Sequence, residues 1–287
     1  MSAPQIPRVG VVGWPIAHSR SPLIHNYWLK TLRITGVYER IAAPPGEFAA
    51  FAQSIRAGVL LGANVTVPHK EAAFAACDWL SPMAGELGAV NTLWRESGKL
   101  CGDNTDVAGF LANLDESAPG WRPPARRVTI IGAGGAARAV VAGLRSRGVE
   151  SITLVNRTHE RARRLARQFG DGVEAAPDIA MIEALAGADM LVNTSSLGMQ
   201  GQPPLVIDLS PLPGHALVAD LVYVPLRTPL IEAAAARGLR VVDGLGMLLH
   251  QAAPGFERWF GVRPTVTARL RALIEADITG AQMSAVR

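Results

Sequence analysis

The chain alternates short apolar runs with segments whose apolar residues recur at helical spacing. In the first hundred residues, the runs predict strands at Arg8–Val12, Val37–Ile41 and Gly62–Val67, then a hairpin of Ala89–Arg95 with Lys99–Gly102. The intervening segments predict helices over Ser21–Leu32, Pro45–Arg56, and from Pro68 through Cys77 to Leu80. Ser21 is expected to be the N-cap of the first helix, with Pro22 at its first position. Such alternation favours an α/β domain with a mainly parallel sheet.

A Pro-rich segment, residues 118–124, separates this region from a second α/β pattern. A strand over Arg126–Ile131 leads into a glycine-rich turn, a helix to Arg147 and a strand over Ser151–Asn156. Later apolar runs predict further strands of the same sheet, at Met190–Asn193, Leu217–Val222 and, at its edge, Arg240–Val242. From Leu245 onward the pattern is helical.

Composition narrows the class of protein. The 287 residues are 49% hydrophobic and 18% charged, which is typical of a globular protein and long enough for two domains. We expect no membrane span and no secretory signal, because no apolar stretch reaches about 18 residues. The net charge of +4 suits an anionic ligand but lacks the clustering of a nucleic-acid binder. Cys77 and Cys101 have no metal-ligand spacing and indicate reduced thiols in the cytoplasm.

The turn after the strand Arg126–Ile131 carries a dinucleotide-binding pattern. Its residues Gly132, Ala133, Gly134, Gly135, Ala136 and Ala137 fit G-x-G-x-x-G/A. Gly132 would allow the tight turn, Gly134 the close approach of a pyrophosphate, and Ala137 the contact of helix with strand. The helix that follows would offer its N–H groups to the phosphates. The alternative is a glycine-rich strand–helix turn of another α/β protein.

The end of the next strand indicates which cofactor binds. NAD sites usually have an acidic residue there, whereas this chain has Asn156, Arg157 and Thr158. Arg157, with Arg161 four residues further on, could bind a 2′-phosphate, so the sequence favours NADP. Three further arginines, Arg163, Arg164 and Arg167, are expected to lie on a solvated helix face.

Small polar residues gather at the strand ends of the first half. Ser19 and Ser21 flank Arg20 before a helix, where two hydroxyls could bind a carboxylate or one could simply cap the helix. Asn64, Thr66 and Lys70 follow one strand toward its carboxyl end, where open α/β sheets bind ligands; Asn91 begins another strand, and Asp106 ends a polar loop.

A lysine and an aspartate that converge on a hydroxyl could transfer the proton that accompanies hydride chemistry. Lys70 would start as the donor at neutral pH, and Asp106 would orient it. Taken singly, Lys70 could instead be a surface charge and Asp106 a turn residue.

With these residues assembled, the chain resembles the shikimate dehydrogenase family along nearly its whole length. The matching stretches are 13–22, 63–70, 88–92, 102–106, 132–136, 156–158 and 243–247. The resemblance implies an α/β substrate domain of residues 1–105 and 244–287, to which the C-terminal helices return. It also implies a Rossmann NADP-binding domain of residues 106–243.

The resemblance further implies roles for individual residues. Lys70 would be the catalytic acid/base, assisted by Asp106. Ser19, Ser21 and Tyr223 would hold the substrate carboxylate, and Thr66, Asn91 and Gln251 the ring hydroxyls. The cofactor would be bound by Gly132, Ala133, Gly134, Gly135, Ala136, Asn156, Arg157, Thr158 and Arg161, with Leu221 and Gly244 near the nicotinamide.

Two residues depart from the family's usual pattern. Val107 stands where a glycine is usual after the catalytic aspartate, and could alter the hinge or the pocket edge. His69 stands where many members have an aromatic residue, and we interpret it as a loop or packing residue rather than an extra titratable group in the site.

The activity implied is reversible NADPH-dependent reduction of 3-dehydroshikimate to shikimate, in aromatic amino-acid biosynthesis, by a monomer or homodimer. One alternative is a quinate or quinate/shikimate dehydrogenase using NAD, which Ser21 and the absence of an acidic residue at 156–158 disfavour. Another is a non-catalytic metabolite or nucleotide sensor, which would have no need to keep both Lys70 and Asp106. No metal is expected.

Overall fold

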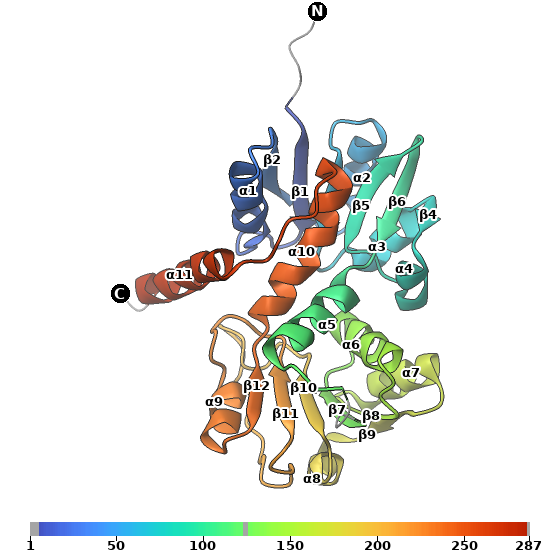
Figure 1. The fold of residues 1–287 in the computed structure, drawn as a ribbon. Helices are drawn as coiled ribbons and strands as arrows, with labels where there is room; N and C mark the ends of the chain where they lie inside the picture. The colour runs from blue at the N-terminus through green and yellow to red at the C-terminus, as the bar shows by residue number, and fades with distance from the viewer. Residues whose placement is uncertain (1–5, 123–125, 286–287) are drawn as a thin grey trace, which may run out of the picture. The chain divides into compact units, whose positions relative to one another are not determined.

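The computed structural model describes residues 6–122 and 126–285, the side chains of 281–285 excepted (Figure 1). The chain divides into two compact units. Unit 1 comprises Met1–Thr105 and Gln251–Ile274, and unit 2 comprises Asp106–His250 and Glu275–Arg287. Among the described residues, each unit has a six-stranded sheet. No helix in this part of the chain is both long and apolar enough to span a bilayer.

Unit 1 confirms the predicted mainly parallel sheet with a hairpin. Its strands are β1 (Arg8–Gly13), β2 (Val37–Ala42), β3 (Gly62–Val65), β4 (Trp79–Leu80), β5 (Thr92–Glu96) and β6 (Lys99–Asp103), in the order β2-β1-β3-β5-β6-β4. β1 is parallel to β2 and β3, and β4 is parallel to β6, whereas β5 is antiparallel to both neighbours. The helices between them are α1 (Ser21–Thr31), α2 (Phe48–Arg56), α3 (Lys70–Ala76) and α4 (Pro82–Leu87).

The structure corrects the predicted helix through Cys77 to Leu80. α3 ends at Ala76, and β4 pairs with β6 instead. The reason is Asp78, whose backbone N–H donates to the Leu100 carbonyl at 2.8 Å and whose carboxylate accepts the Leu100 N–H at 2.8 Å. Arg56 of α2 also pairs with that carboxylate, which fixes the turn.

The predicted N-cap at Ser21 is also wrong. Arg20 occupies the cap position, with helical φ/ψ of −95° and −3°, and Ser21 is the first helical residue. The Ser21 N–H donates to the Ser19 hydroxyl at 3.4 Å. Ser19 therefore satisfies a free N–H at the start of α1, and the Ser21 side chain is not used as a cap.

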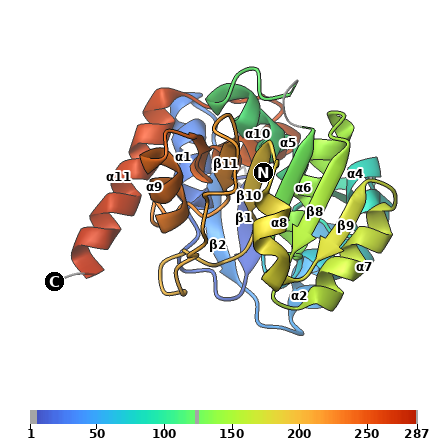
Figure 2. The same ribbon diagram turned by 90° about the horizontal axis from the view of Figure 1, so that it is seen from below.

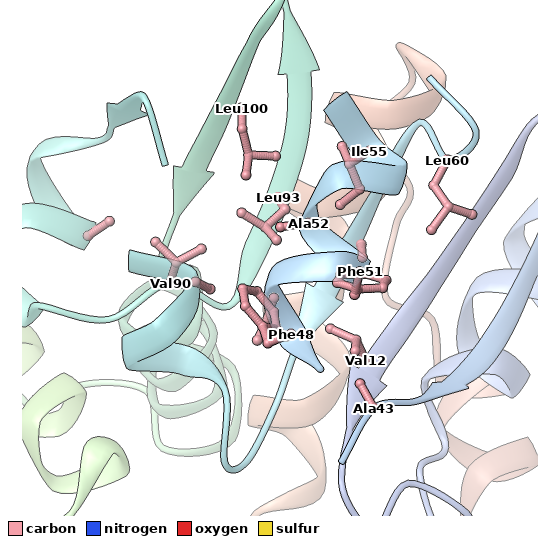
Figure 3. Packing of buried hydrophobic residues seen from close by; sticks show 14 residues of the cluster. Val12, Ala43, Phe48, Phe51, Ala52, Ile55, Leu60, Val90, Leu93 and Leu100 are labelled. Atoms are coloured by element: carbon pink, nitrogen blue, oxygen red, sulfur yellow. The ribbon is translucent and has the colours of Figure 1, made fainter. Parts of the chain in front are cut away.

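Side chains alternate between the two faces of the sheet in unit 1, so each face has its own core. On the face covered by α2, Leu93 and Leu100 pack with Phe48, Phe51 and other buried residues, and Figure 3 shows the α2 side chains turned toward the strands. On the opposite face, the next residues of β5 and β6, Trp94 and Cys101, pack in a second cluster.

The second core includes a residue from the far end of the sequence. Trp259 belongs to α10 (Leu245–Phe260), and its indole N–H donates to the Leu93 carbonyl at 2.9 Å. A Cβ at Gly62 would lie 2.1 Å from the Trp259 Nε1, so only glycine leaves room for this ring against β3. The Trp28 indole of α1 likewise donates to the Thr265 carbonyl at 3.2 Å. The C-terminal segment thus completes the core of unit 1.

Unit 2 confirms the predicted Rossmann sheet. Its strands are β7 (Arg127–Ile131), β8 (Ser151–Val155), β9 (Val173–Ala176), β10 (Met190–Asn193), β11 (Leu217–Asp220) and β12 (Arg240–Val242), all parallel and ordered β12-β11-β10-β7-β8-β9 (Figure 1). Figure 2 shows β11, β10, β8 and β9 following one another in this order. The order reverses between β7 and β10, which is the switch point where such sheets bind dinucleotides.

Helices connect the strands of unit 2. They are α5 (Asp106–Ser117), α6 (Gly135–Ser146), α7 (His159–Phe169), the short helices η1 (Asp178–Ala180) and α8 (Met181–Leu185), and α9 (Pro229–Ala236). Figure 1 shows α9 beside the edge strand β12 and α7 at the opposite end of the sheet, beside β9. α11 (Ala268–Ala285) begins in unit 1 and ends in unit 2.

Candidate active site

In unit 1, two amide side chains that are far apart in sequence meet next to β5. The Asn91 Nδ2 lies 3.4 Å from the Gln251 Oε1 and donates to the Thr105 hydroxyl at 3.0 Å. The Thr105 hydroxyl lies 2.8 Å from the Gln251 carbonyl oxygen, and its backbone N–H donates to the Asn91 Oδ1 at 2.9 Å. Thr105 therefore fixes both the first turn after β6 and the start of the returning segment.

A second layer of polar residues lies behind Asn91. The Asn64 Nδ2 donates to the Asn91 carbonyl and to the Thr92 hydroxyl, each at 3.2 Å. The buried Tyr38 hydroxyl donates to the Asn64 Oδ1 at 2.6 Å, and the Thr92 hydroxyl donates to the Asn91 Oδ1 at 2.9 Å. These bonds fix the orientation of both amides. Asn64 was singled out from the sequence, but Tyr38 and Thr105 were not.

Ser19 and Ser21 lie where β1 leads into α1. Arg40 of β2 holds this loop, since its Nε and Nη2 donate to the Ser19 carbonyl at 3.0 and 2.7 Å. The Ser21 side chain is buried and hydrogen-bonds to Tyr38, whose pKa burial raises well above its usual value. The loop is thus tied to the same polar layer as Asn64.

Thr66 and Lys70 follow β3. Thr66 lies just beyond the end of the strand and Lys70 is the first residue of α3; both are half-buried. Between them, His69 is buried, stacks on Phe48 and makes a 2.7 Å hydrogen bond from its Nε2 to the Ala43 carbonyl. The interpretation of His69 as a packing residue is confirmed.

Asp106 opens unit 2. The sequence placed it in a polar loop, but the structure makes it the first residue of α5, where it is buried. The Thr105 N–H donates to the Asn91 side chain, which fixes the backbone just before Asp106. The polar loop therefore ends at Thr105 and the helix begins at the next residue. Val107, one of the two departures, is buried in the same helix.

The glycine-rich turn has the geometry of a phosphate-binding loop. Gly132 has a φ of +113°, and a Cβ there would lie 2.5 Å from the Thr194 hydroxyl, so the turn requires glycine. Gly134 caps α6 and Gly135 begins it, both exposed, and a Cβ at either would meet no protein atom within 4 Å. Ala133 and Ala136 are half-buried and Ala137 is buried. These residues fit a dinucleotide pyrophosphate at the N-terminus of α6.

The loop after β8 is positively charged and exposed. The Asn156 Nδ2 donates to the Thr158 carbonyl at 2.8 Å, which closes the loop just before α7. Arg157 is exposed on this loop and Arg161 is exposed in the first turn of α7, whereas Arg163 and Arg167 pair with Glu160 at 3.7 and 2.7 Å. That pairing agrees with the solvated helix face expected for the later arginines.

Leu221, Tyr223 and Gly244 gather beyond the ends of β11 and β12. A Cβ at Gly244 would lie 2.2 Å from the Leu221 carbonyl oxygen, so these two backbones are in direct contact. Leu221 and Tyr223 are half-buried on the loop that follows Asp220. Among the residues that the structure describes, no cluster of His, Cys, Asp and Glu could hold a metal ion.

Comparisons with known proteins match three stretches of the chain to one family. Family models match residues 11–93, as the shikimate dehydrogenase substrate binding domain, residues 122–200, as shikimate/quinate 5-dehydrogenase, and residues 244–273, as the shikimate 5′-dehydrogenase C-terminal domain. A protein of Methylocella silvestris named shikimate dehydrogenase (NADP(+)) is 56% identical over 272 residues, covering 95% of this chain and 97% of that one.

Solved structures give the same result. Shikimate 5-dehydrogenase from Thermus thermophilus, in complex with NADP(H) and shikimate, is 37% identical with a TM-score of 0.85, covering 94% of this chain and 100% of its own. Quinate dehydrogenase from Corynebacterium glutamicum, in complex with NAD, is 30% identical with a TM-score of 0.86, covering 94% and 98%.

Proposed function

The chain belongs to the shikimate dehydrogenase family, and from this premise we propose that it catalyses the reversible NADPH-dependent reduction of 3-dehydroshikimate to shikimate. The observation that carries the proposal is the 56% identity, over 95% of the chain, to a relative named for this activity. The protein is thus an NADP-dependent oxidoreductase of the shikimate pathway, which serves aromatic amino-acid biosynthesis.

The polar groups of unit 1 bind the substrate ring. Asn91 and Gln251 supply amide groups to the ring hydroxyls, with Thr66 beside the end of β3. The contact between the Asn91 and Gln251 amides supports this assignment, because it presents donors and acceptors at adjacent points. The hydroxyls of Ser19 and Ser21 bind the carboxylate, together with Tyr223.

Lys70 transfers the proton. In the direction of reduction, its ammonium donates to the oxygen that forms at the substrate carbonyl; in oxidation, its amine takes the hydroxyl proton back. Asp106 assists Lys70 as its acidic partner in the reaction. The position of Lys70 at the start of α3 supports this role, since the Val90 N–H donates to its carbonyl at 2.9 Å and holds its backbone next to Asn91.

Residues of unit 2 hold the cofactor. When bound, NADPH supplies the hydride that reduces the substrate carbonyl. The glycine turn 132–136 binds the pyrophosphate, and Asn156, Arg157, Thr158 and Arg161 bind the 2′-phosphate. Leu221 and Gly244 lie against the nicotinamide. The exposed guanidinium of Arg157 and the bare N-terminus of α6 support the assignment.

We extend the proposal to organisation and location. Residues 1–105 with 244–287 form the substrate-binding domain, and 106–243 form the NADP-binding domain, a division that differs from that of the compact units at 244–250 and 275–287. Hydrogen exchange with NADP should protect amides within 106–243. The free thiols of Cys77 and Cys101 support a cytoplasmic location. Light scattering should give a monomer or a homodimer.

Lys70→Ala tests the mechanism. We expect kcat for shikimate oxidation to fall at least about a hundredfold, the size typical of a general acid/base. Shikimate affinity, measured by calorimetry, should change only severalfold. Lys30→Ala, an exposed lysine of α1, is the matched control and should behave as wild type. Undiminished turnover of Lys70→Ala would remove Lys70 from the mechanism.

A substrate and cofactor panel tests the activity itself. The pure protein should have its highest kcat/KM with shikimate and NADP. A higher value with quinate and NAD would replace the proposed activity with that of the quinate dehydrogenases. Binding of NADP without turnover of either substrate would indicate a sensor.

A further inference from the structure

A buried carboxylate lies at the end of β11, next to the loop that carries Leu221 and Tyr223. Asp220 is the last residue of the strand and is 1% exposed. A buried ionised carboxylate costs several kcal/mol unless hydrogen bonds compensate. Burial accordingly raises the pKa of Asp220 above its usual value. The other residues of β11, Leu217, Val218 and Ala219, are buried and apolar, so the presence of a buried carboxylate at the end of this strand requires an explanation.

The carboxylate accepts hydrogen bonds from three neutral donors. Its Oδ1 accepts from the Val222 N–H at 3.0 Å and from the Asn193 Nδ2 at 2.9 Å. Its Oδ2 accepts from the Thr228 hydroxyl at 2.6 Å. Val222 and Thr228 lie near the two ends of the loop 221–228, so a single side chain closes this loop.

The Thr228 bond requires a carboxylate oxygen on this side. The Thr228 hydroxyl also accepts the Ile231 N–H at 3.2 Å, as the N-cap of α9, so its own proton needs an acceptor. An amide nitrogen at the Oδ2 position would present a second donor to Thr228 instead. The substitution Asp220→Asn therefore disrupts this one bond while it keeps the shape of the side chain.

The other partner, Asn193, connects the same point to the next loop. Its Oδ1 accepts from the Ser195 N–H at 3.0 Å, and its backbone carbonyl accepts from the Leu221 N–H at 2.9 Å. Thr194 between them lies against Gly132 of the phosphate-binding turn. Asp220 thus begins the loop 221–228 and is connected through Asn193 and Thr194 to the turn 132–136.

We infer that Asp220 is a positioning residue for the reaction, which holds Leu221 and Tyr223 in place by tying both ends of their loop through Val222 and Thr228. The inference rests on the proposed function, in which Tyr223 binds the substrate carboxylate and Leu221 lies against the nicotinamide. Asp220 touches neither ligand and acts through these two residues.

Asp220→Asn is the primary test, on the full-length protein with shikimate and NADP. We expect KM for shikimate to rise about tenfold and kcat to fall, while KM for NADP stays within about threefold, because the phosphate-binding residues lie on other loops. Thr228→Ser keeps the hydroxyl and should remain within about twofold of wild type. Leu185→Ala removes a buried side chain from the same unit and should lower stability without changing either KM.

A double-mutant cycle separates positioning from general stability. If Asp220 acts through Tyr223, Asp220→Asn should raise KM for shikimate far less in a Tyr223→Phe background than in the wild type. Additive effects of the two substitutions, or an Asp220→Asn variant with unchanged kinetics, would overturn the inference. A wild-type protein that does not turn over shikimate would instead refute the proposed function. The two failures are distinguishable, because only the inference about Asp220 depends on the difference between variants.

Discussion

Because His25 is buried in the core of unit 1, we predict that the free energy of unfolding falls at acidic pH. Its imidazole is fully buried and lies parallel to the Tyr38 ring, with 4.0 Å between ring centroids. Phe256, Trp28 and Trp259 surround it, with centroid distances of 5.5 to 6.0 Å. Burial lowers the pKa of His25 from 6.5 to about 3. The folded protein therefore keeps this ring neutral at pH values where the unfolded chain binds a proton.

The magnitude follows from the pKa difference. Because the pKa of His25 is lower in the folded protein, proton binding favours the unfolded chain below pH 6.5. The free energy of unfolding is therefore at its full value above pH 6.5 and falls as the pH falls toward 3. Each pKa unit corresponds to about 1.4 kcal/mol, so protonation of His25 in the unfolded chain should lower the free energy of unfolding by about 2 kcal/mol between pH 6.5 and 5, and by about 4 kcal/mol by pH 3. The smaller value is already a large part of the stability of a typical domain, about 5–15 kcal/mol.

Urea unfolding between pH 7 and 5 measures this effect. Trp28 and Trp259 contact the His25 ring, so tryptophan emission reports on this region. His25→Phe keeps the aromatic stack but cannot titrate; its extra volume should cost about 1–3 kcal/mol at every pH. His25→Asn removes the ring without overpacking.

The difference in slope between wild type and variants isolates His25 from the other titrating groups. Both variants should lose about 2 kcal/mol less than wild type between pH 6.5 and 5. Equal slopes in all three proteins would refute the reasoning, whatever their absolute stabilities.

Three further predictions concern single residues. Arg157→Ala should raise KM for NADP about tenfold and leave that for NAD within about twofold, because a charge-assisted bond to the 2′-phosphate is lost; equal changes for both cofactors would contradict this role. Gly244→Ala places a Cβ 2.2 Å from the Leu221 carbonyl oxygen, so Tm and kcat should both fall, and a wild-type Tm would show that the backbone yields. Tyr38→Phe leaves the buried Asn64 oxygen without its 2.6 Å bond and should cost about 1–3 kcal/mol in calorimetry; an unchanged Tm would argue against that bond.

The parts of the fold that the sequence predicts are those set by local pattern. Buried runs such as Arg127–Ile131 are bounded by glycine or proline, and their neighbours along the chain form helices that cross back over the sheet. The two-residue strand β4 gave no such signal. It forms because Asp78 hydrogen-bonds to Leu100, a residue more than twenty positions away. The hydrophobic pattern along the chain does not predict a bond between such distant residues.

The site divides in the same way. Residues with a recognisable motif, such as Gly132 and Lys70, are visible in the sequence with their expected chemistry. Thr105, Tyr38 and Asp220 act by hydrogen-bonding to other side chains, and their partners lie on other strands or loops. In the sequence Asp220 is only one polar residue within an apolar run, and the Thr228 hydroxyl that returns to it becomes apparent only in three dimensions.

The fit of Trp259 against Gly62 has a consequence for synthesis on the ribosome. Residues 1–105 emerge first, but the ring that covers this face of their sheet arrives only after the whole of residues 106–250 has been translated. At about 5–20 residues per second, the nascent chain therefore exposes Tyr38 and Trp28 for roughly ten seconds or more. During that interval this apolar face is a natural site for chaperones to protect.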